Sequence, residues 1–413
     1  MSAPQPVKYG FRAWLPIIGL AFAAFVFNTS EFLPVGLLPN IAEHLNETVS
    51  FTGLVITGYA WVVAVMSLPL TIITAKLERR KLLLALIAVF ALAHFAVIVA
   101  DTFERLFAAR VAVALTHSIF WSIMTPLAAR MAPRGKRAVG LAAVMGGTIV
   151  ATVLGVPIGT QLGHMFGWQE AFFIIGIAAA LVFALIWLVL PECVSTHAGS
   201  LKSLPVILKR PALIQLYCLT AVTVLGQYTA YSYISPILQS VGGFADGDVV
   251  TTLFVFGIAG IIGTVLSSKL VDRYPSGALV APLIAISACL FLIIPTCHHF
   301  GVLMGVVVIW GAAMTAVCMA FQTMLLNAAP DAADIAASLY SGIFNIGIGG
   351  GAFLGSRILS ASGYEPIVWT GASIVALSAL STLFVWWRTG SAALKGPAPA
   401  ETKAGSAPIE EKA

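Results

Sequence analysis

The chain has 413 residues, of which 59% are hydrophobic and only 9% are charged, and its mean hydropathy is +0.98. A soluble core cannot enclose so much apolar side chain, so the composition excludes a soluble globular protein and predicts a polytopic membrane protein. The net charge of +5 does not indicate nucleic-acid binding, because the basic residues are scattered through short loops. The five cysteines lack paired spacing, so we expect neither a disulfide framework nor a metal site.

Apolar segments recur along the chain at regular intervals and predict twelve transmembrane helices. The longest polar interruption, 191–211, follows the sixth segment. We therefore expect an all-α fold of two pseudo-symmetric six-helix bundles, 14–190 and 212–388, joined by a cytoplasmic linker, with a short N-terminal segment (1–13) and a disordered tail (389–413). The expected spans are 14–38, 51–73, 82–100, 106–131, 138–162, 169–190, 212–236, 248–270, 277–295, 301–327, 335–359 and 366–387.

The distribution of basic residues predicts the orientation of the chain in the membrane. An even number of helices places both termini on one side, and all of the 22 Lys and Arg residues except Arg105, Arg110 and Arg357 fall on that side. The positive-inside rule then predicts that both termini are cytoplasmic. Residues 1–12 lack the cleavage site of a signal peptide, so we expect the first helix to remain in the membrane.

Glu31 interrupts the first apolar run, which is long enough to cross a bilayer core of about 30 Å. An acidic residue near the bilayer centre costs roughly 2.5 to 3.5 kcal/mol, so this side chain should face protein or a water-filled cavity. Burial disfavours the charged form of a carboxyl group and so favours proton uptake. We interpret Glu31 as a proton carrier or ligand anchor. The alternative is a structural carboxylic acid hydrogen-bonded inside a bundle.

The fourth predicted helix carries ionisable groups along one stripe. His117 follows Arg110 at i+7, and Trp121 follows it at i+11. The Arg110 guanidinium cannot lose its proton and must find carboxylate, carbonyl or water partners. A histidine titrates near neutral pH, so His117 is a candidate proton-relay partner for Glu31. A histidine that only bonds a neighbouring helix fits the same position, and we interpret His94 in the third helix in that way.

Small residues form a smooth face on the fifth predicted helix. Gly155, Gly159 and Gly163 recur at i, i+4 and i+8, which favours close packing against another helix. Pro157 lies inside this run and should kink the helix because it lacks a backbone N–H. The eleventh helix repeats the pattern with glycines around Asn345.

The seventh predicted helix has the richest neutral polar patch. Gln227, Tyr228 and Tyr231 place one amide and two phenols on adjoining faces. Such a surface stacks on the apolar face of a ring and forms hydrogen bonds, which suits a sugar; the alternative is an aromatic belt at the membrane boundary. The predicted substrate-binding residues are Asn28, Tyr59, Trp121, Gln227, Tyr228, Tyr231, Gln322 and Asn345, none of which carries a charge.

The segment 269–273 reads Lys-Leu-Val-Asp-Arg, and it resembles the Asp-Arg signature loop of the major facilitator superfamily. The segment 76–81 is a degenerate copy that keeps the basic cluster but lacks the usual Gly and Asp. Arg110 resembles the arginine of the fourth helix, and the glycines around Pro157 resemble the antiporter motif of proton-coupled exporters. The resemblance implies gating or structural roles for Arg110, Gly155, Pro157, Gly159, Asp272 and Arg273.

Longer phrases are more specific, among them Asn28-Thr29-Ser30-Glu31-Phe32, Phe120-Trp121-Ser122 and Tyr228-Thr229-Ala230-Tyr231-Ser232-Tyr233. Between about Trp14 and Trp387 such phrases resemble one branch of that superfamily, the bacterial sugar efflux transporters. The resemblance implies a proton-coupled antiporter of the inner membrane that exports pentoses and small galactosides by alternating access and works as a single chain. Neighbouring branches export drugs, nucleosides or amino acids, and these substrates are the alternatives.

A membrane-embedded enzyme or a channel is the rival class. The sequence has no Walker loop, no intramembrane protease dyad, no lysine in mid-helix for a Schiff base and no ring of acidic residues for a pore. The pair His298-His299 has no acidic neighbour, and we interpret it as part of a polar loop. We therefore expect a transporter that needs no cofactor, whose partners are a small sugar, protons and membrane lipid.

Overall fold

The structure is a computed structural model, and it describes residues 10–133, 136–193, 204–270, 275–329 and 333–389. All regular secondary structure in these ranges is helical, and twelve segments are long and apolar enough to cross a membrane. The predicted all-α fold with twelve spans is therefore confirmed. Asp272 and Arg273, the middle of the predicted linker, most of the N-terminal segment and nearly all of the predicted tail lie outside the described residues.

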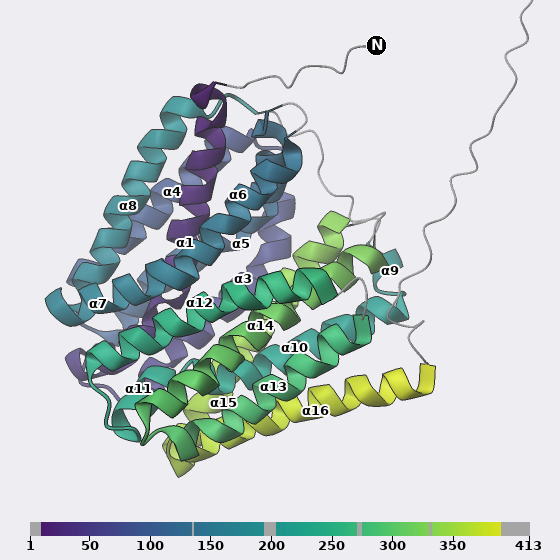
Figure 1. The fold of residues 1–413 in the computed structure, drawn as a ribbon. Helices are drawn as coiled ribbons and strands as arrows, with labels where there is room; N and C mark the ends of the chain where they lie inside the picture. Colours follow the sequence, from purple (N-terminus) through teal and green to yellow (C-terminus); the bar gives the residue numbers. More distant parts are fainter. Residues whose placement is uncertain (1–9, 134–135, 194–203, 271–274, 330–332, 390–413) are drawn as a thin grey trace, which may run out of the picture.

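The first bundle contains six spans, each formed by one long helix or by consecutive helices that continue one another (Figure 1). Several are longer than predicted, because the helices continue beyond the apolar runs into polar residues. Its helices are η1 (Phe11–Trp14), α1 (Leu15–His44), α2 (Val49–Thr52), α3 (Leu54–Ile73), α4 (Arg79–Ala96), η2 (Val97–Val99), α5 (Phe103–Met131), α6 (Arg137–Val150), η3 (Ala151–Gly155), α7 (Val156–Phe166) and α8 (Trp168–Val189).

The second bundle contains the other six spans and packs beside the first (Figure 1). Its helices are α9 (Leu204–Ile207), α10 (Pro211–Tyr231), α11 (Ile234–Ser240), α12 (Asp246–Leu270), α13 (Pro275–Thr296), α14 (Phe300–Ala328), α15 (Ala333–Ser362) and α16 (Glu365–Thr389).

Each bundle has its own aromatic core. In the first, the ring of Phe27 lies between Phe90 and Phe120, with centroid distances of 4.1 and 3.9 Å. In the second, Trp310 packs edge-on against Phe256, with their centroids 5.0 Å apart. Stacked and edge-to-face rings add about 0.5 to 1.5 kcal/mol beyond the burial of their surface. The two cores give each bundle a packing of its own.

A glycine face brings the fifth span against α1. A Cβ atom at Gly155 would overlap the Thr29 hydroxyl, and one at Gly159 would lie 2.9 Å from the Leu33 side chain. At Gly155 the added atom would also lie 3.1 Å from Cβ of Thr29, which is fixed to the backbone, so this position requires glycine. Pro157 stands in the first turn of α7, directly after the π-helical turn η3. Because proline has no N–H, the regular ladder is interrupted here, and the wider turn accommodates the break.

The loop before α4 is held by its own acidic residue, Glu78. Its carboxylate accepts hydrogen bonds from the backbone N–H groups of Arg80 (2.8 Å), Lys81 (2.8 Å) and Cys193 (2.6 Å). Burial alone would raise the pKa of Glu78, but these bonds and the Lys81 charge lower it below the ordinary value. Glu78 thus caps α4 and ties this loop to the chain that follows α8.

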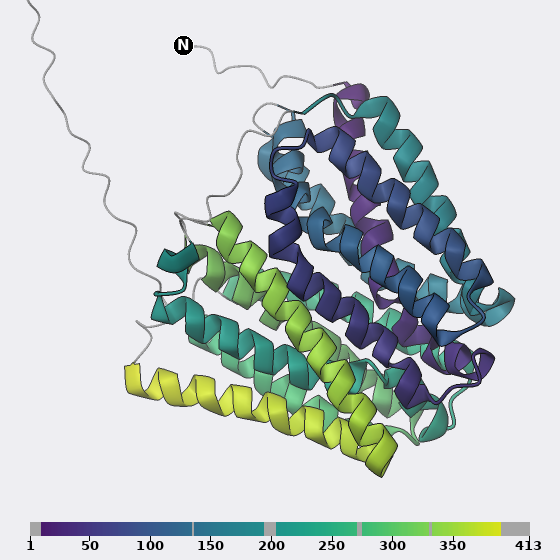
Figure 2. The same ribbon diagram turned by 180° about the vertical axis from the view of Figure 1, so that it is seen from behind.

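The two bundles touch through residues at one end, which we call the contact end. There the Ser50 hydroxyl donates to the carbonyl of Ser356 (2.7 Å), and the Ser235 hydroxyl donates to the carbonyl of Gly36 (3.1 Å). The bundles separate towards the opposite, diverging end, where α1 begins and α16 ends (Figures 1 and 2). The bundles remain in contact as far as the middle of the molecule, where a Cβ atom at Gly257 of α12 would lie 2.7 Å from the backbone of Val153 in η3, and they separate beyond it.

The close packing of the fifth span against α1 can be tested by comparing alanine substitutions at two adjacent glycines. A Cβ at Gly147 would overlap the backbone carbonyl of Ala21, whereas a Cβ at Gly146 would meet nothing within 4 Å. We expect Gly147→Ala to lower the free energy of unfolding by about 1 to 3 kcal/mol, as overpacking does. Gly146→Ala should leave stability unchanged or raise it by up to about 1 kcal/mol through helix propensity. Thermal unfolding in detergent, followed with a thiol-reactive dye, measures both. Equal midpoints for the two variants would contradict the close packing.

The contact end can be tested by cross-linking. The Ser50 and Ser360 hydroxyl oxygens lie 2.5 Å apart, so sulfur atoms at these positions can form a disulfide with little movement. In a chain without its native cysteines, Ser50→Cys with Ser360→Cys should cross-link on mild oxidation. A protease site inserted between 194 and 203 lets a gel show whether the halves stay joined without reductant.

The control pair for this cross-link is Val139→Cys with Leu266→Cys, on exposed positions of α6 and α12 towards the diverging end. We expect no cross-link between them in the same preparation. Cross-linking at the control pair without cross-linking at Ser50 and Ser360 would show that the bundles do not meet as described.

Candidate functional site

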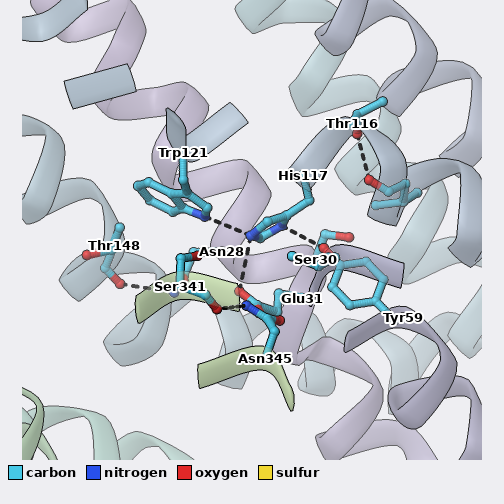
Figure 3. A network of polar contacts seen from close by, with 12 residues as sticks. Asn28, Ser30, Glu31, Tyr59, Thr116, His117, Trp121, Thr148, Ser341 and Asn345 are labelled. Atoms are coloured by element: carbon cyan, nitrogen blue, oxygen red, sulfur yellow. Dashed lines mark hydrogen bonds and ion pairs between the residues drawn. The ribbon is translucent and has the colours of Figure 1, made fainter. Parts of the chain in front are cut away.

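Glu31 lies in the middle of α1 with only a tenth of its side chain exposed, and it faces α5 (Figure 3). Its Oε2 atom is 3.7 Å from Nε2 of His117, whose side chain is 2% exposed. This distance allows an ion pair when the imidazole is protonated, but it is long for a hydrogen bond. The structure therefore brings together the two residues predicted as proton carrier and relay.

His117 is bonded at both ring nitrogens. Nδ1 lies 2.6 Å from the Tyr59 hydroxyl of α3, and Nε2 accepts a hydrogen bond of 2.7 Å from the Trp121 indole N–H (Figure 3). Trp121 is one turn along α5 from His117, as the predicted stripe requires. The three side chains form a connected network beside Glu31.

Arg110 is buried one layer behind this network. Its Nη1 atom donates to both the carbonyl oxygen and the hydroxyl of Ser30, each at 3.1 Å. The guanidinium also lies 4.3 Å from the centroid of the Tyr59 ring and 5.6 Å from that of Phe172, which are cation–π distances. Arg110 therefore finds a carbonyl and aromatic rings as partners, and it stands close enough to Glu31 for electrostatic interaction.

Ser30 links Arg110 to His94. The Nδ1 atom of His94 lies 2.8 Å from the carbonyl of Phe90, so it must donate there, and Nε2 then accepts from the Ser30 hydroxyl at 2.7 Å. His94 is fully buried, and both its nitrogens are used. These bonds suit the structural role proposed for His94. The sequence did not predict this bridging role for Ser30, the residue that precedes Glu31.

Asn28 faces the fifth span. Its amide donates to the carbonyl of Thr148 at 3.3 Å and to the hydroxyl of Thr152 at 3.4 Å (Figure 3). The amide thus joins α1 to the turn at which α6 passes into η3. Two of the predicted substrate-binding residues of the first bundle, Tyr59 and Trp121, lie in the His117 network, whereas Asn28 holds two helices together.

Tyr228 is the residue of the second bundle that approaches Glu31. Its ring centroid lies 6.1 Å from that of Phe32, which follows Glu31 in α1, and 6.4 Å from that of Phe344. Its hydroxyl is close enough to Glu31 for electrostatic interaction. Tyr228 therefore stands where the two bundles meet.

Asn345 and Tyr340 of α15 carry buried polar atoms without partners. The Asn345 amide donates to the carbonyl of Ser341 at 3.0 Å, while its Oδ1 atom has no hydrogen bond. The Tyr340 hydroxyl is buried and likewise unpaired. An unpaired buried polar atom costs about 1 to 3 kcal/mol, so a ligand or water that bonds to these atoms is favoured. The sequence did not single out Tyr340, because a lone tyrosine in an apolar helix carries no pattern.

Gln227 and Tyr231 face away from Glu31, into the second bundle. The Trp310 indole N–H donates to the Gln227 amide oxygen at 2.8 Å, and the Tyr231 ring packs against Trp310 at 5.8 Å. Gln322 on α14 is exposed. Of the three residues predicted on the seventh span, Gln227 and Tyr231 therefore lie inside the second bundle, and Tyr228 lies at the interface between the bundles. Sequence reasoning missed Trp310, because a tryptophan inside an apolar run gives no sign of its partner.

Comparison with known proteins identifies the family. The model of the Major Facilitator Superfamily matches residues 20–348, well over half of the chain. The chain belongs to the Major Facilitator Superfamily. Its members are transporters, so this chain is a multi-pass membrane transporter and not an enzyme.

Two solved structures share this fold. Both are of a bacterial homologue of the human lysosomal transporter Spinster, one inward-facing and unoccupied, the other inward-facing and occupied. Each has a TM-score of 0.73 and 17% sequence identity, and the match covers 95% of this chain and 100% of the other. Identity at this level shows the superfamily fold alone.

A cavity of about 400 Å³ lies elsewhere in this superfamily member, among α10, α13, α14 and α16. The Ser378 and Thr382 hydroxyls that line it donate to carbonyls of their own helix, Ile374 and Ser378. None of the described residues that line it has a buried side-chain nitrogen or oxygen without a hydrogen-bond partner. We therefore locate the functional site from the polar network around Glu31 rather than from this cavity.

Within the described residues, no group of three His, Cys, Asp or Glu could hold a metal ion.

The bridge made by Ser30 can be tested by removing its hydroxyl. Ser30→Ala takes the partner from His94 Nε2 and one acceptor from Arg110, so we expect a loss of about 1 to 3 kcal/mol in the free energy of unfolding. The control is Ser118→Ala, because the buried Ser118 hydroxyl bonds only the Leu115 carbonyl of its own helix. Thermal unfolding in detergent compares them. A control variant less stable than Ser30→Ala would contradict the bridging role.

Proposed function

We propose that this transporter is a proton-coupled antiporter that exports small sugars by alternating access. The observation that carries the proposal is the pair of Glu31 and His117, two ionisable side chains 3.7 Å apart, deep in the membrane-spanning region and beside the second bundle. Ionisable groups at this depth are costly and mark ion or proton pathways.

The proposed proton coupling depends on Glu31. Every other acidic residue in the described part of the chain stands at a helix end or in a loop, as Glu78 and Glu104 do. A carboxyl group enclosed by protein can exchange a proton with an adjacent imidazole, and Glu31 has one in His117. We propose that Glu31 takes up a proton from one side of the membrane and releases it on the other.

The proposed sugar binding depends on neutral polar groups. Tyr228, the unpaired Oδ1 of Asn345 and the unpaired hydroxyl of Tyr340 offer donors and acceptors without charge. A sugar presents hydroxyl groups that satisfy both kinds of atom, and its apolar ring face suits the aromatic side chains. The residues that the second bundle contributes to this site carry no charge, which suits a neutral cargo.

Coupling requires that proton and sugar bias the same equilibrium between two states of the bundles. We propose that the bundles 14–190 and 212–388, joined by 191–211, rock about the site between them. Basic residues gather towards the diverging end, so by the positive-inside rule that end and both termini face the cytoplasm of a bacterial inner membrane. The present arrangement then corresponds to a state open to the inside, and the chain acts as a monomer.

The substitution Glu31→Gln tests the proposed proton coupling. The amide cannot carry a proton, so uphill sugar export in proteoliposomes with an imposed pH gradient should fall to background, while some sugar binding remains. Glu104→Gln is the matched control, because Glu104 is an exposed acid in the first turn of α5. Retained uphill export by the Glu31 variant would refute the proton role.

The substrate class is tested in the same vesicles. Labelled arabinose and a lipophilic cation are offered separately to the unaltered chain. Export of arabinose driven by the proton gradient supports the sugar assignment. Export of the cation with no movement of arabinose would replace the sugar exporter by a multidrug exporter.

A further inference from the structure

His117 is held at its two nitrogens by partners of different character. The indole of Trp121 has an N–H and no acceptor, so at 2.7 Å it can only donate to Nε2. Nε2 must therefore carry a lone pair. The single proton of the neutral ring then sits on Nδ1 and is donated to the Tyr59 oxygen, 2.6 Å away. Trp121 thus fixes which nitrogen of His117 carries the proton.

The same nitrogen is the one nearest Glu31. Glu31 Oε2 lies 3.7 Å from Nε2, too far for a hydrogen bond but within reach of a small side-chain movement. The lone pair on Nε2 can accept from one donor at a time. While the Trp121 N–H occupies it, a protonated Glu31 cannot hand its proton to His117.

We propose that Trp121 is a positioning residue that controls proton transfer between Glu31 and His117, blocking it when bonded to Nε2 and permitting it when displaced. The inference rests on the proposed proton role of Glu31. In the permitted step the O–H bond of Glu31 breaks and an N–H bond forms at Nε2 of His117. The products are a carboxylate and an imidazolium that pair with each other, and Tyr59 keeps its bond to Nδ1.

The proton passes between two residues of the same site, and the charged and titratable groups around His117 determine how easily it does so. The groups that face the ring are Glu31 from α1, Tyr59 from α3, and Arg110 and Trp121 from α5. Burial opposes the charged form of both groups, and the fixed charge of Arg110 further opposes an imidazolium but favours the Glu31 carboxylate formed with it. Because the proton only changes partner, the net charge of the site stays the same.

Trp121 is placed to respond to a ligand. Its side chain is partly exposed, whereas His117 is buried, so the indole can move without opening the core of the first bundle. A sugar ring stacked on the indole would compete with its present position. Arrival of the solute would then free Nε2, so that proton transfer follows binding.

The test reads the state of His117 directly. In protein labelled with ¹⁵N-histidine, reconstituted in lipid, we expect His117 Nδ1 to show the signal of a protonated nitrogen and Nε2 that of an unprotonated one. His117→Gln assigns the signal. Trp121→Phe keeps a ring but removes the donor, so the balance should shift towards Nε2–H by about fivefold, the effect of one ordinary hydrogen bond.

Trp168→Phe is the matched control, because the Trp168 indole is buried and has no hydrogen-bond partner. It should leave the His117 signals unchanged. Signals of His117 that are the same in Trp121→Phe as in the unaltered chain would overturn the inference. So would an Nε2–H signal in the unaltered chain.

A transport measurement separates this inference from the proposed function. Vesicles carrying Trp121→Phe should pass protons without solute several-fold faster than the unaltered chain, because the block is gone. If Glu31→Gln abolishes uphill export but Trp121→Phe leaves the proton leak at the unaltered level, the control by Trp121 is wrong and the antiporter stands. If Trp121→Phe shifts the His117 signals while Glu31→Gln exports normally, the antiporter assignment fails.

Discussion

A permanent positive charge inside the membrane is the constraint on which this site depends. The Arg110 guanidinium cannot shed its proton, so the fold must supply partners for it. Ser30 supplies two acceptor atoms, and the rings of Tyr59 and Phe172 supply their faces. Satisfying Arg110 draws α1, α3, α4, α5 and α8 together, because Ser30 also bonds His94. Glu31 and His117 meet as a consequence, one residue along α1 and two turns along α5.

The fifth span allows that meeting by letting α1 come close. Its glycines leave no side chain between the helices at Gly147 and Gly155, and the π-helical turn before Pro157 brings Thr148 and Thr152 within reach of the Asn28 amide. Backbone irregularity at membrane depth is tolerated where protein surrounds it. Here it orients the polar stretch of α1, and it does so with small residues rather than with charge.

The two bundles contribute different chemistry to the site. The first holds the ionisable residues: His117 and Arg110 are hydrogen-bonded to neighbouring side chains, and Glu31 lies 3.7 Å from His117. The second offers Tyr228, Tyr340 and Asn345, which are neutral and partly unpaired. A proton and a neutral solute can thus act on different bundles and still influence one equilibrium, because Tyr228 and Phe32 pack together across the interface.

The sequence by itself determined the twelve spans, because a helix that crosses a bilayer core needs about twenty predominantly apolar residues and each run has about that length. It also determined the stripe of Arg110, His117 and Trp121 and the depth of Glu31, because helical periodicity relates residues within one helix. Only the tertiary structure decided which atoms meet across helices. Asn28 bonds Thr148, 120 residues away, and Gln227 bonds Trp310, 83 residues away. The rotation of each helix about its axis follows from such packing between distant segments, and no pattern within one helix encodes it.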